Sequence, residues 1–122
     1  MDKPNKKILL VDDDMCKLSE QLARLMARYS VEVFAVEDFE GAVAMTKTNK
    51  FDLILLDFQL KGYKSGLDVL DEIRKTDKDT LICMLSAYSE HEKYAMSLGA
   101  NKYFHKPFDW KKHILDPLGI KY

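Results

Sequence analysis

The chain has 122 residues, of which 47% are apolar and 32% are charged, a composition typical of one globular domain with its own core. The formal net charge is −1 and no long run of one sign occurs, so nothing in the composition points to nucleic acid or an anionic membrane surface as a partner. No apolar run approaches the roughly 18 residues that a membrane-spanning helix requires.

Hydrophobic periodicity predicts strands and helices that alternate along the whole chain. In the first half the expected elements are a strand at 8–11, a helix from the cap Asp14 to about residue 28, a strand at 31–35, a helix after the cap Asp38, and a strand at 51–57. In the second half they are a helix from Ser65, a strand at 81–85, a helix from Ser89 to Gly99, a short strand at 103–105, and a last helix from Pro107 to about residue 116.

Local signals support the helix boundaries. Two stretches, 65–68 and 89–92, read as capping boxes, in which a serine is followed three residues later by an acid. The first helix is expected to turn one apolar face inward, made of Leu18, Leu22, Leu25, Met26 and Tyr29.

Regular alternation of strand and helix predicts an α/β fold, in which right-handed crossovers join parallel strands and helices cover both faces. We therefore expect a three-layer, doubly wound five-stranded parallel sheet of order 2-1-3-4-5, the flavodoxin-like arrangement. The expected domain is the whole chain, 1–122, with a core at about 6–116 and a C-terminal tail at 117–122.

Polar side chains follow four of the expected strands. Asp12 and Asp13 follow the first strand, and Asp57, Ser86 and Lys106 lie at the ends of the third, fourth and fifth. In the order 2-1-3-4-5 these positions gather at the carboxyl edge of the sheet, where open α/β sheets bind ligands.

Three neighbouring carboxylates repel one another unless a cation lies among them. An all-oxygen ligand set favours a hard cation, Mg²⁺ or Mn²⁺ in its place. An aspartate can attack a phosphoryl group to form an aspartyl phosphate, while a lysine and Mg²⁺ offset the charge on the transferred oxygens. The set therefore predicts phosphoryl transfer.

Four short stretches then resemble the signature of two-component response-regulator receiver domains. They are Val11-Asp12-Asp13-Asp14, Leu56-Asp57, Leu85-Ser86-Ala87 and Lys106-Pro107-Phe108. All four occur in order and at suitable spacing, and the resemblance covers about residues 6–114.

The resemblance implies that Asp57 is the phosphoacceptor and that a histidine kinase or a histidine phosphotransfer protein donates the phosphoryl group. It implies that Asp13, Asp57 and the main-chain carbonyl of Gln59 bind Mg²⁺, and that Asp12 assists through water. Such a domain is a signalling switch, not an enzyme, apart from catalysing its own phosphorylation and dephosphorylation.

The resemblance also assigns the switch residues. Lys106 would pair with the phosphoryl group, Ser86 would turn toward it, and Tyr103 would swing inward as the aromatic switch. The last helices and strand would then present a changed face to a downstream protein. We expect no direct contact with nucleic acid or membrane, and a monomer or weak dimer.

The sequence departs from the family pattern after Asp57. The loop 58–66 is one residue longer than usual and carries Lys61 where proline is common. Gln59 and Tyr88 fall where the family tunes the loss of phosphate, and the last helix is short.

Two alternatives remain from the sequence. One is a receiver-like binding module that is never phosphorylated. The other is a haloacid-dehalogenase-type phosphohydrolase with Asp12 as nucleophile, which the short chain and the lack of a cap domain disfavour. Turnover of phosphomonoesters that depends on Asp12 but not on Asp57 would favour the phosphohydrolase.

The histidines and cysteines are expected to have no role in the site. His91, His105 and His113 do not converge at any metal-binding spacing and are expected at the surface. Cys16 and Cys83 form no CxxC pair, which favours free thiols in a reducing, cytoplasmic setting.

Overall fold

The computed structural model describes residues 6–122, apart from the side chains of Met15 and Cys16. The expected free thiol at Cys16 therefore lies outside the described residues, whereas Cys83 is a buried free cysteine, as expected. Within residues 6–122, no helix combines the length and the apolar character needed to cross a bilayer.

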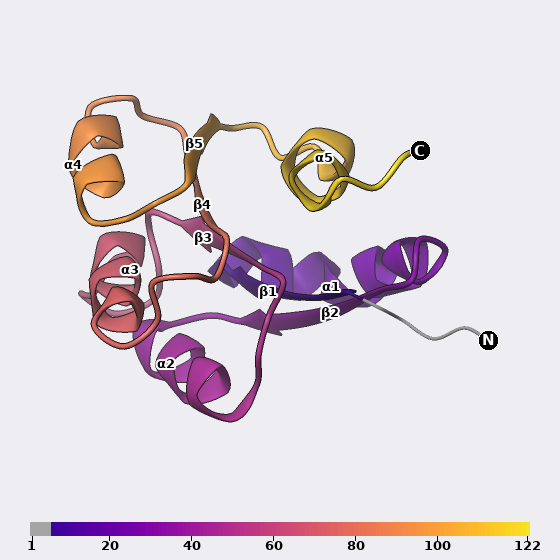
Figure 1. The fold of residues 1–122 in the computed structure, drawn as a ribbon, viewed down its shortest axis with the longest axis horizontal. Helices are drawn as coiled ribbons and strands as arrows, with labels where there is room; N and C mark the ends of the chain where they lie inside the picture. The colour runs from indigo at the N-terminus through magenta and orange to yellow at the C-terminus, as the bar shows by residue number, and fades with distance from the viewer. Residues whose placement is uncertain (1–5) are drawn as a thin grey trace.

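The elements alternate as the sequence predicts (Figure 1). The strands are β1 (Lys6–Val11), β2 (Val31–Val36), β3 (Leu53–Asp57), β4 (Ile82–Ser86) and β5 (Lys102–His105). The helices are α1 (Asp13–Ala27), α2 (Phe39–Thr48), α3 (Gly66–Arg74) and α4 (Glu92–Ser97), followed by a π-helical segment η1 (Lys111–Leu115) that continues into α5 (Asp116–Leu118).

All strand pairs are parallel, and the sheet order is β2-β1-β3-β4-β5. The predicted order 2-1-3-4-5 is therefore confirmed. β3 lies in the middle and is buried along its whole length, as its continuous apolar run predicts. The carboxyl ends of β1, β3, β4 and β5 consequently meet at one edge of the sheet.

Two apolar cores cover the two faces of the sheet. One packs side chains of β1, β3 and β4 against α2, α3 and α4, with Leu56 and Val69 among its fully buried members. The other packs alternate residues of the same strands against α1 and η1, with Met26 and Ile114 at its centre. This period-two division of each strand produces the three layers predicted from the sequence.

The start of α1 differs from the prediction. Asp12, not Asp14, caps the helix: its backbone is extended and its carboxylate accepts a hydrogen bond of 2.9 Å from the Asp14 N–H. Because β1 passes into α1 without an intervening loop, the cap falls on the first residue after the strand. Leu18 was also expected inward, but 56% of it is exposed, at the margin of an apolar pocket that it shares with Leu22 and Phe108.

At the N-termini of the other helices, two of the predicted caps are confirmed and one is wrong. Asp38 caps α2, and Ser65 forms the predicted capping box at α3. The box expected at 89–92 is wrong: α4 begins at Glu92 after His91, which makes no capping hydrogen bond through its side chain. Hydrogen bonds from Tyr88 to Ser86 and from Tyr103 to Tyr88 hold the segment before α4 in a turn.

The last helical segment also begins later than expected. It starts at Lys111, not near Pro107, and it continues through Pro117 to Leu118, where Gly119 ends it in the left-handed conformation. Pro117 is tolerated because it lies in the first turn of α5. His113 is buried, contrary to the expected surface position, because Phe104 and Phe108 pack around its ring.

Candidate functional site

The acidic cluster forms where β1 and β3 end beside each other. Carboxylate oxygens of Asp12, Asp13 and Asp57 all lie within 4.8 Å of one another. Asp12 and Asp57 are only 5% and 4% exposed, while Asp13 is half-buried. The strand order has thus brought together carboxylates that are more than 40 positions apart in the chain.

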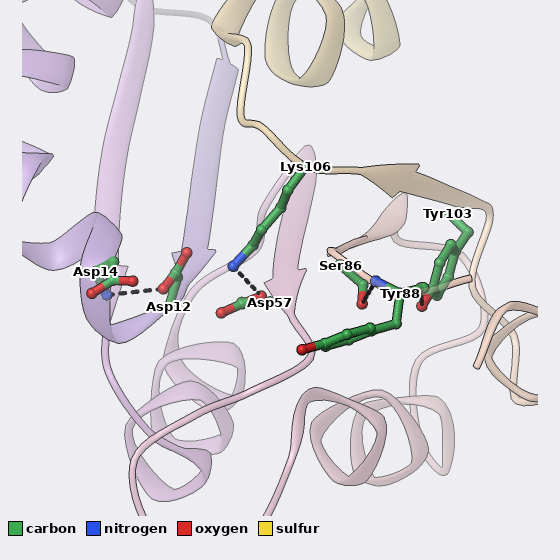
Figure 2. A network of polar contacts seen from close by, with 7 residues as sticks. All are labelled: Asp12, Asp14, Asp57, Ser86, Tyr88, Tyr103 and Lys106. Carbon is green, nitrogen blue, oxygen red and sulfur yellow. Dashed lines mark hydrogen bonds and ion pairs between the residues drawn. The ribbon is translucent and has the colours of Figure 1, made fainter. Parts of the chain in front are cut away.

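Lys106 completes the cluster from β5. Figure 2 shows its side chain reaching from the end of that strand toward Asp57, and its Nζ lies 2.9 Å from Asp57 Oδ1. The Lys106 N–H donates to the carbonyl of Ser86 at 2.9 Å, which ties the end of β5 to the end of β4. The ammonium group therefore approaches the acids from the side opposite to β1.

The electrostatics of the cluster favour a bound cation. Burial, followed by the charge of Asp57, raises the pKa of Asp12 to about 6. Burial also raises the pKa of Asp57, although the hydrogen bond and charge of Lys106 act to lower it. One lysine thus compensates only part of the negative charge that the fold places here.

Ser86 and Tyr103 form a second group beside the acids. Ser86 is buried, and its Oγ accepts a hydrogen bond of 3.1 Å from the Tyr88 N–H. The Tyr103 hydroxyl donates to the Tyr88 carbonyl at 2.6 Å (Figure 2). Both groups therefore hold the turn between β4 and α4, which explains why this turn does not form the first turn of the helix.

The loop after Asp57 closes one side of an open pocket of about 440 Å³. Asp13, Asp57, Gln59 and Lys106 are among the residues that line it. The extended loop takes a defined path, because Lys61 forms an ion pair of 2.7 Å with Glu37 and its backbone bridges to the start of α2.

Gly66 belongs to the site, although the sequence indicated it only as a member of the capping box at 65–68. A Cβ atom at this position would lie 2.2 Å from the Asp57 carbonyl oxygen. The Gly66 N–H also donates to the Phe58 carbonyl at 2.8 Å. Only glycine allows α3 to start this close to the end of β3. The available signal was a glycine in the first helical turn after the loop that follows Asp57, where other residues form helices better.

The three histidines take no part in the acidic cluster. Among the described residues, the cluster capable of holding a metal contains only carboxylates, and none of the three histidines takes part. His113 instead accepts a hydrogen bond of 3.0 Å at Nδ1 from the Asp109 N–H, and burial lowers its pKa. Of the oxygen donors expected from the sequence, the structure brings the carboxylates of Asp12, Asp13 and Asp57 together, a set that suits a hard cation.

Comparison with known proteins gives one consistent family. The model of the response regulator receiver domain matches residues 8–115. The transcriptional regulatory protein CpxR of Klebsiella pneumoniae is 36% identical over 104 residues, covering 84% of this chain and 44% of CpxR. The sensory transduction protein LytT of Bacillus subtilis is 32% identical over 105 residues, covering 84% and 43%. The chain thus spans about half the length of these relatives.

Solved structures agree with this assignment. The response regulator TrrA of Thermotoga maritima, in complex with Mg²⁺-BeF, superposes with a TM-score of 0.74 at 33% identity, covering 88% of this chain and 92% of TrrA. The non-phosphorylated HemR receiver domain of Leptospira biflexa gives a TM-score of 0.80 at 27% identity, covering 97% and 98%. The chain belongs to the receiver domains of two-component response regulators.

Proposed function

We propose that this domain is a phosphoacceptor switch in which Asp57 takes up a phosphoryl group and thereby changes the surface formed by α4 and β5. The observation that carries the proposal is the cluster itself: three carboxylates within 4.8 Å and Lys106 bonded to one of them. Receiver domains are signalling domains, not classical enzymes, and they interact with histidine kinases and downstream effectors.

The residues present fit a magnesium ion. Receiver domains bind Mg²⁺ in an acidic pocket, and this pocket offers only oxygen donors. We assign Asp12, Asp13, Asp57 and the main-chain carbonyl of Gln59 to it, with Asp12 acting through water because its carboxylate already caps α1. Mn²⁺ suits the same donors. When bound, the ion supplies charge neutralisation for the transferred phosphoryl oxygens.

In the transfer step, a carboxylate oxygen of Asp57 attacks the phosphorus of a phosphohistidine. The P–O bond to Asp57 forms as the P–N bond breaks, and the imidazole leaves with the electron pair. Lys106, which pairs with Asp57 before transfer, can follow the charge onto the new phosphoryl oxygens over a short distance. Asp57 must be ionised to attack. Burial disfavours the ionised carboxylate, and Lys106 stabilises it.

The switch follows from what the phosphoryl group offers to its neighbours. It adds a charge of about −1.5 to −2 and new acceptor oxygens at the carboxyl edge. The Ser86 hydroxyl would turn to donate to one of these oxygens and give up its contact with the Tyr88 N–H. Tyr103, bonded to the same turn, would move with it and change the surface presented by α4 and β5.

The proposed partners are a histidine kinase or a histidine phosphotransfer protein upstream and a protein target downstream. The relatives, of which this chain spans about half, are a transcriptional regulatory protein, CpxR, and a sensory transduction protein, LytT. We propose that 1–122 is a single receiver domain in the cytoplasm, a monomer or weak dimer, which itself contacts neither nucleic acid nor membrane.

Intact mass spectrometry after incubation with acetyl phosphate tests the proposal directly. We expect one phosphoryl adduct on the wild type that requires Mg²⁺ and is absent from Asp57→Asn. A wild type that gains no adduct, and whose melting temperature Mg²⁺ does not raise, would instead support a receiver-like module that is never phosphorylated.

The phosphohydrolase alternative places the nucleophile at Asp12. In this structure one carboxylate oxygen of Asp12 caps α1, whereas Lys106 pairs with Asp57 and not with Asp12, which favours Asp57 as the nucleophile. Comparing Asp12→Asn with Asp57→Asn on a chromogenic phosphomonoester separates the two mechanisms, since a phosphohydrolase would lose turnover only in Asp12→Asn.

A further inference from the structure

An aromatic contact joins the loop after Asp57 to the start of α4. The rings of Phe58 and His91 are stacked, with centroids 4.0 Å apart and an angle of 10° between their planes. Phe58 directly follows the phosphoacceptor, and His91 directly precedes α4. The contact therefore connects the proposed metal site with a helix of the proposed output surface.

Phe58 is held on both sides by its backbone. Its N–H donates to the Leu85 carbonyl at 3.3 Å, and its carbonyl accepts from the Gly66 N–H at 2.8 Å. Its ring is partly buried and packs against the core that α2, α3 and α4 cover. The next carbonyl in the chain belongs to Gln59, and both residues line the site pocket, so a contact that restrains Phe58 acts one residue away from this proposed ligand.

His91 uses its ring for this contact and not for capping. It occupies the N-cap position of α4, where Ser, Thr, Asp or Asn is preferred, and its side chain makes no capping hydrogen bond. Helix α4 has only six residues and therefore depends on tertiary contacts at its ends. The stack is one such contact, and the Tyr88–Tyr103 hydrogen bond in the preceding turn is another.

We propose that His91 is a positioning residue for the metal site: by stacking on Phe58 it orients the Gln59 carbonyl and couples Mg²⁺ binding to the N-terminus of α4. This inference rests on the proposed function and deepens it, because it adds a contact from the output side of the molecule to the site. Since coupling between two sites is reciprocal, Mg²⁺ must stabilise the start of α4 as much as the stack strengthens Mg²⁺ binding.

The first test compares His91→Ala, which removes the stack, with His91→Phe, which keeps an aromatic ring there. Calorimetric titration with Mg²⁺ should show binding weakened about two- to tenfold in His91→Ala and largely restored in His91→Phe. Amide hydrogen exchange gives the reciprocal readout: Mg²⁺ should slow exchange in α4 of the wild type and of His91→Phe, but not in His91→Ala. A purely structural role would not make this response to Mg²⁺ depend on the ring.

A double-mutant cycle identifies the partner. If the stack carries the effect, Phe58→Leu combined with His91→Ala should bind Mg²⁺ as weakly as Phe58→Leu alone. Lys93→Ala, on the same helix, is the matched control and should leave Mg²⁺ affinity unchanged. Equal Mg²⁺ affinity in wild type and folded His91→Ala, or additive losses in the cycle, would overturn the inference alone. Failure of the wild type to bind Mg²⁺ would overturn the proposed function as well.

Discussion

Two of the three carboxylates in the acidic cluster, Asp12 and Asp57, are almost completely buried. An ionised carboxylate loses hydration on burial, and here Asp12 also faces the charge of Asp57, while Asp57 faces that of Asp13. Without a cation the ionised cluster therefore opposes folding. The burial of these carboxylates thus lowers stability at single residues, a cost that the proposed binding of Mg²⁺ would offset.

Asp12→Asn should consequently stabilise the metal-free protein at pH 7. The pKa of Asp12 is raised from 3.8 to about 6, so its ionised form costs at most about 3 kcal/mol of folding free energy. Asparagine keeps an oxygen that can cap α1. Urea unfolding in EDTA should show an increase of about 1–3 kcal/mol, and Mg²⁺ should stabilise the variant less than the wild type.

The pH dependence of this difference follows from the sign of the shift. Because the folded state binds the Asp12 proton more tightly, the penalty is complete above pH 6 and disappears as the pH falls toward 3.8. The gain in Asp12→Asn should thus fall to about half at pH 5. Burial also lowers the pKa of His113, so both proteins lose stability at this residue as the pH falls. The difference between the wild type and Asp12→Asn cancels this shared loss. A gain that is constant from pH 7 to pH 4 would contradict this account, and Asp71→Asn, at an exposed position of α3, is the control.

Gly66→Ala should destabilise the fold by about 2 kcal/mol or more. The added methyl would meet the Asp57 carbonyl oxygen at 2.2 Å, and this oxygen belongs to the backbone of β3, which cannot move aside as a flexible side chain would. Gly62→Ala is the matched control: its φ of 86° makes alanine unfavourable by about 1 kcal/mol, but nothing lies within 4 Å. Equal losses in urea unfolding would show that close approach at Gly66 costs nothing.

At the scale of elements, Arg74 at the end of α3 joins three parts of the chain. Although buried, it donates to the carbonyls of Asp77, Thr80 and Gly99, at 2.7–3.0 Å, and to the Asn101 side chain at 3.0 Å. Its guanidinium thus fastens the turn before β4 and the loop between α4 and β5 to α3. Helix α4 therefore has a firmly held C-terminal side.

Arg74→Lys should destabilise the protein by about 2 kcal/mol, because one ammonium group cannot replace a fork of donors directed at four acceptors. Urea unfolding measures the loss. Arg24→Lys, on the exposed side of α1, should change stability by less than about 0.5 kcal/mol. If lysine at position 74 were equally harmless, the four hydrogen bonds would not stabilise the fold.

The elements also show what a sequence can predict. The alternation of buried runs and helices was enough for the sheet order, and the order alone brought Asp12, Asp57 and Lys106 to one edge. These features depend on local patterns and on general rules of chain topology. The site was therefore predictable in outline from the residues that end each strand.

What the sequence reading missed depends on contacts between distant segments. The capping box expected at 89–92 fails because Tyr88 and His91 bind Tyr103 and Phe58 instead. Burial of His113 depends on where η1 starts, which Phe104 helps to determine from β5. No pattern within a few residues of these positions encodes such partners.

At the scale of the whole molecule, the site and α4 are linked through two separate contacts. Phe58 and His91 join them directly, while Ser86, Tyr88 and Tyr103 join β4, its following turn and β5. α1 and η1 lie on the opposite face of the sheet (Figure 1). A charge change at Asp57 is therefore expected to alter the α4–β5 side more than the face covered by α1.

Tyr103→Ala separates the chemistry from this readout. Tyr103 bonds the turn at Tyr88 and touches no member of the acidic cluster through a hydrogen bond, so phosphorylation of Asp57 by acetyl phosphate should stay within about twofold of the wild type. Amide hydrogen exchange with Mg²⁺ and beryllofluoride should reveal a change across 87–105 in the wild type that is largely lost in the variant. Tyr94→Ala, exposed on α4, is the control. If the exchange response were unchanged in Tyr103→Ala, Tyr103 would have only a packing role. The Phe58–His91 contact would then be the remaining connection between Asp57 and α4.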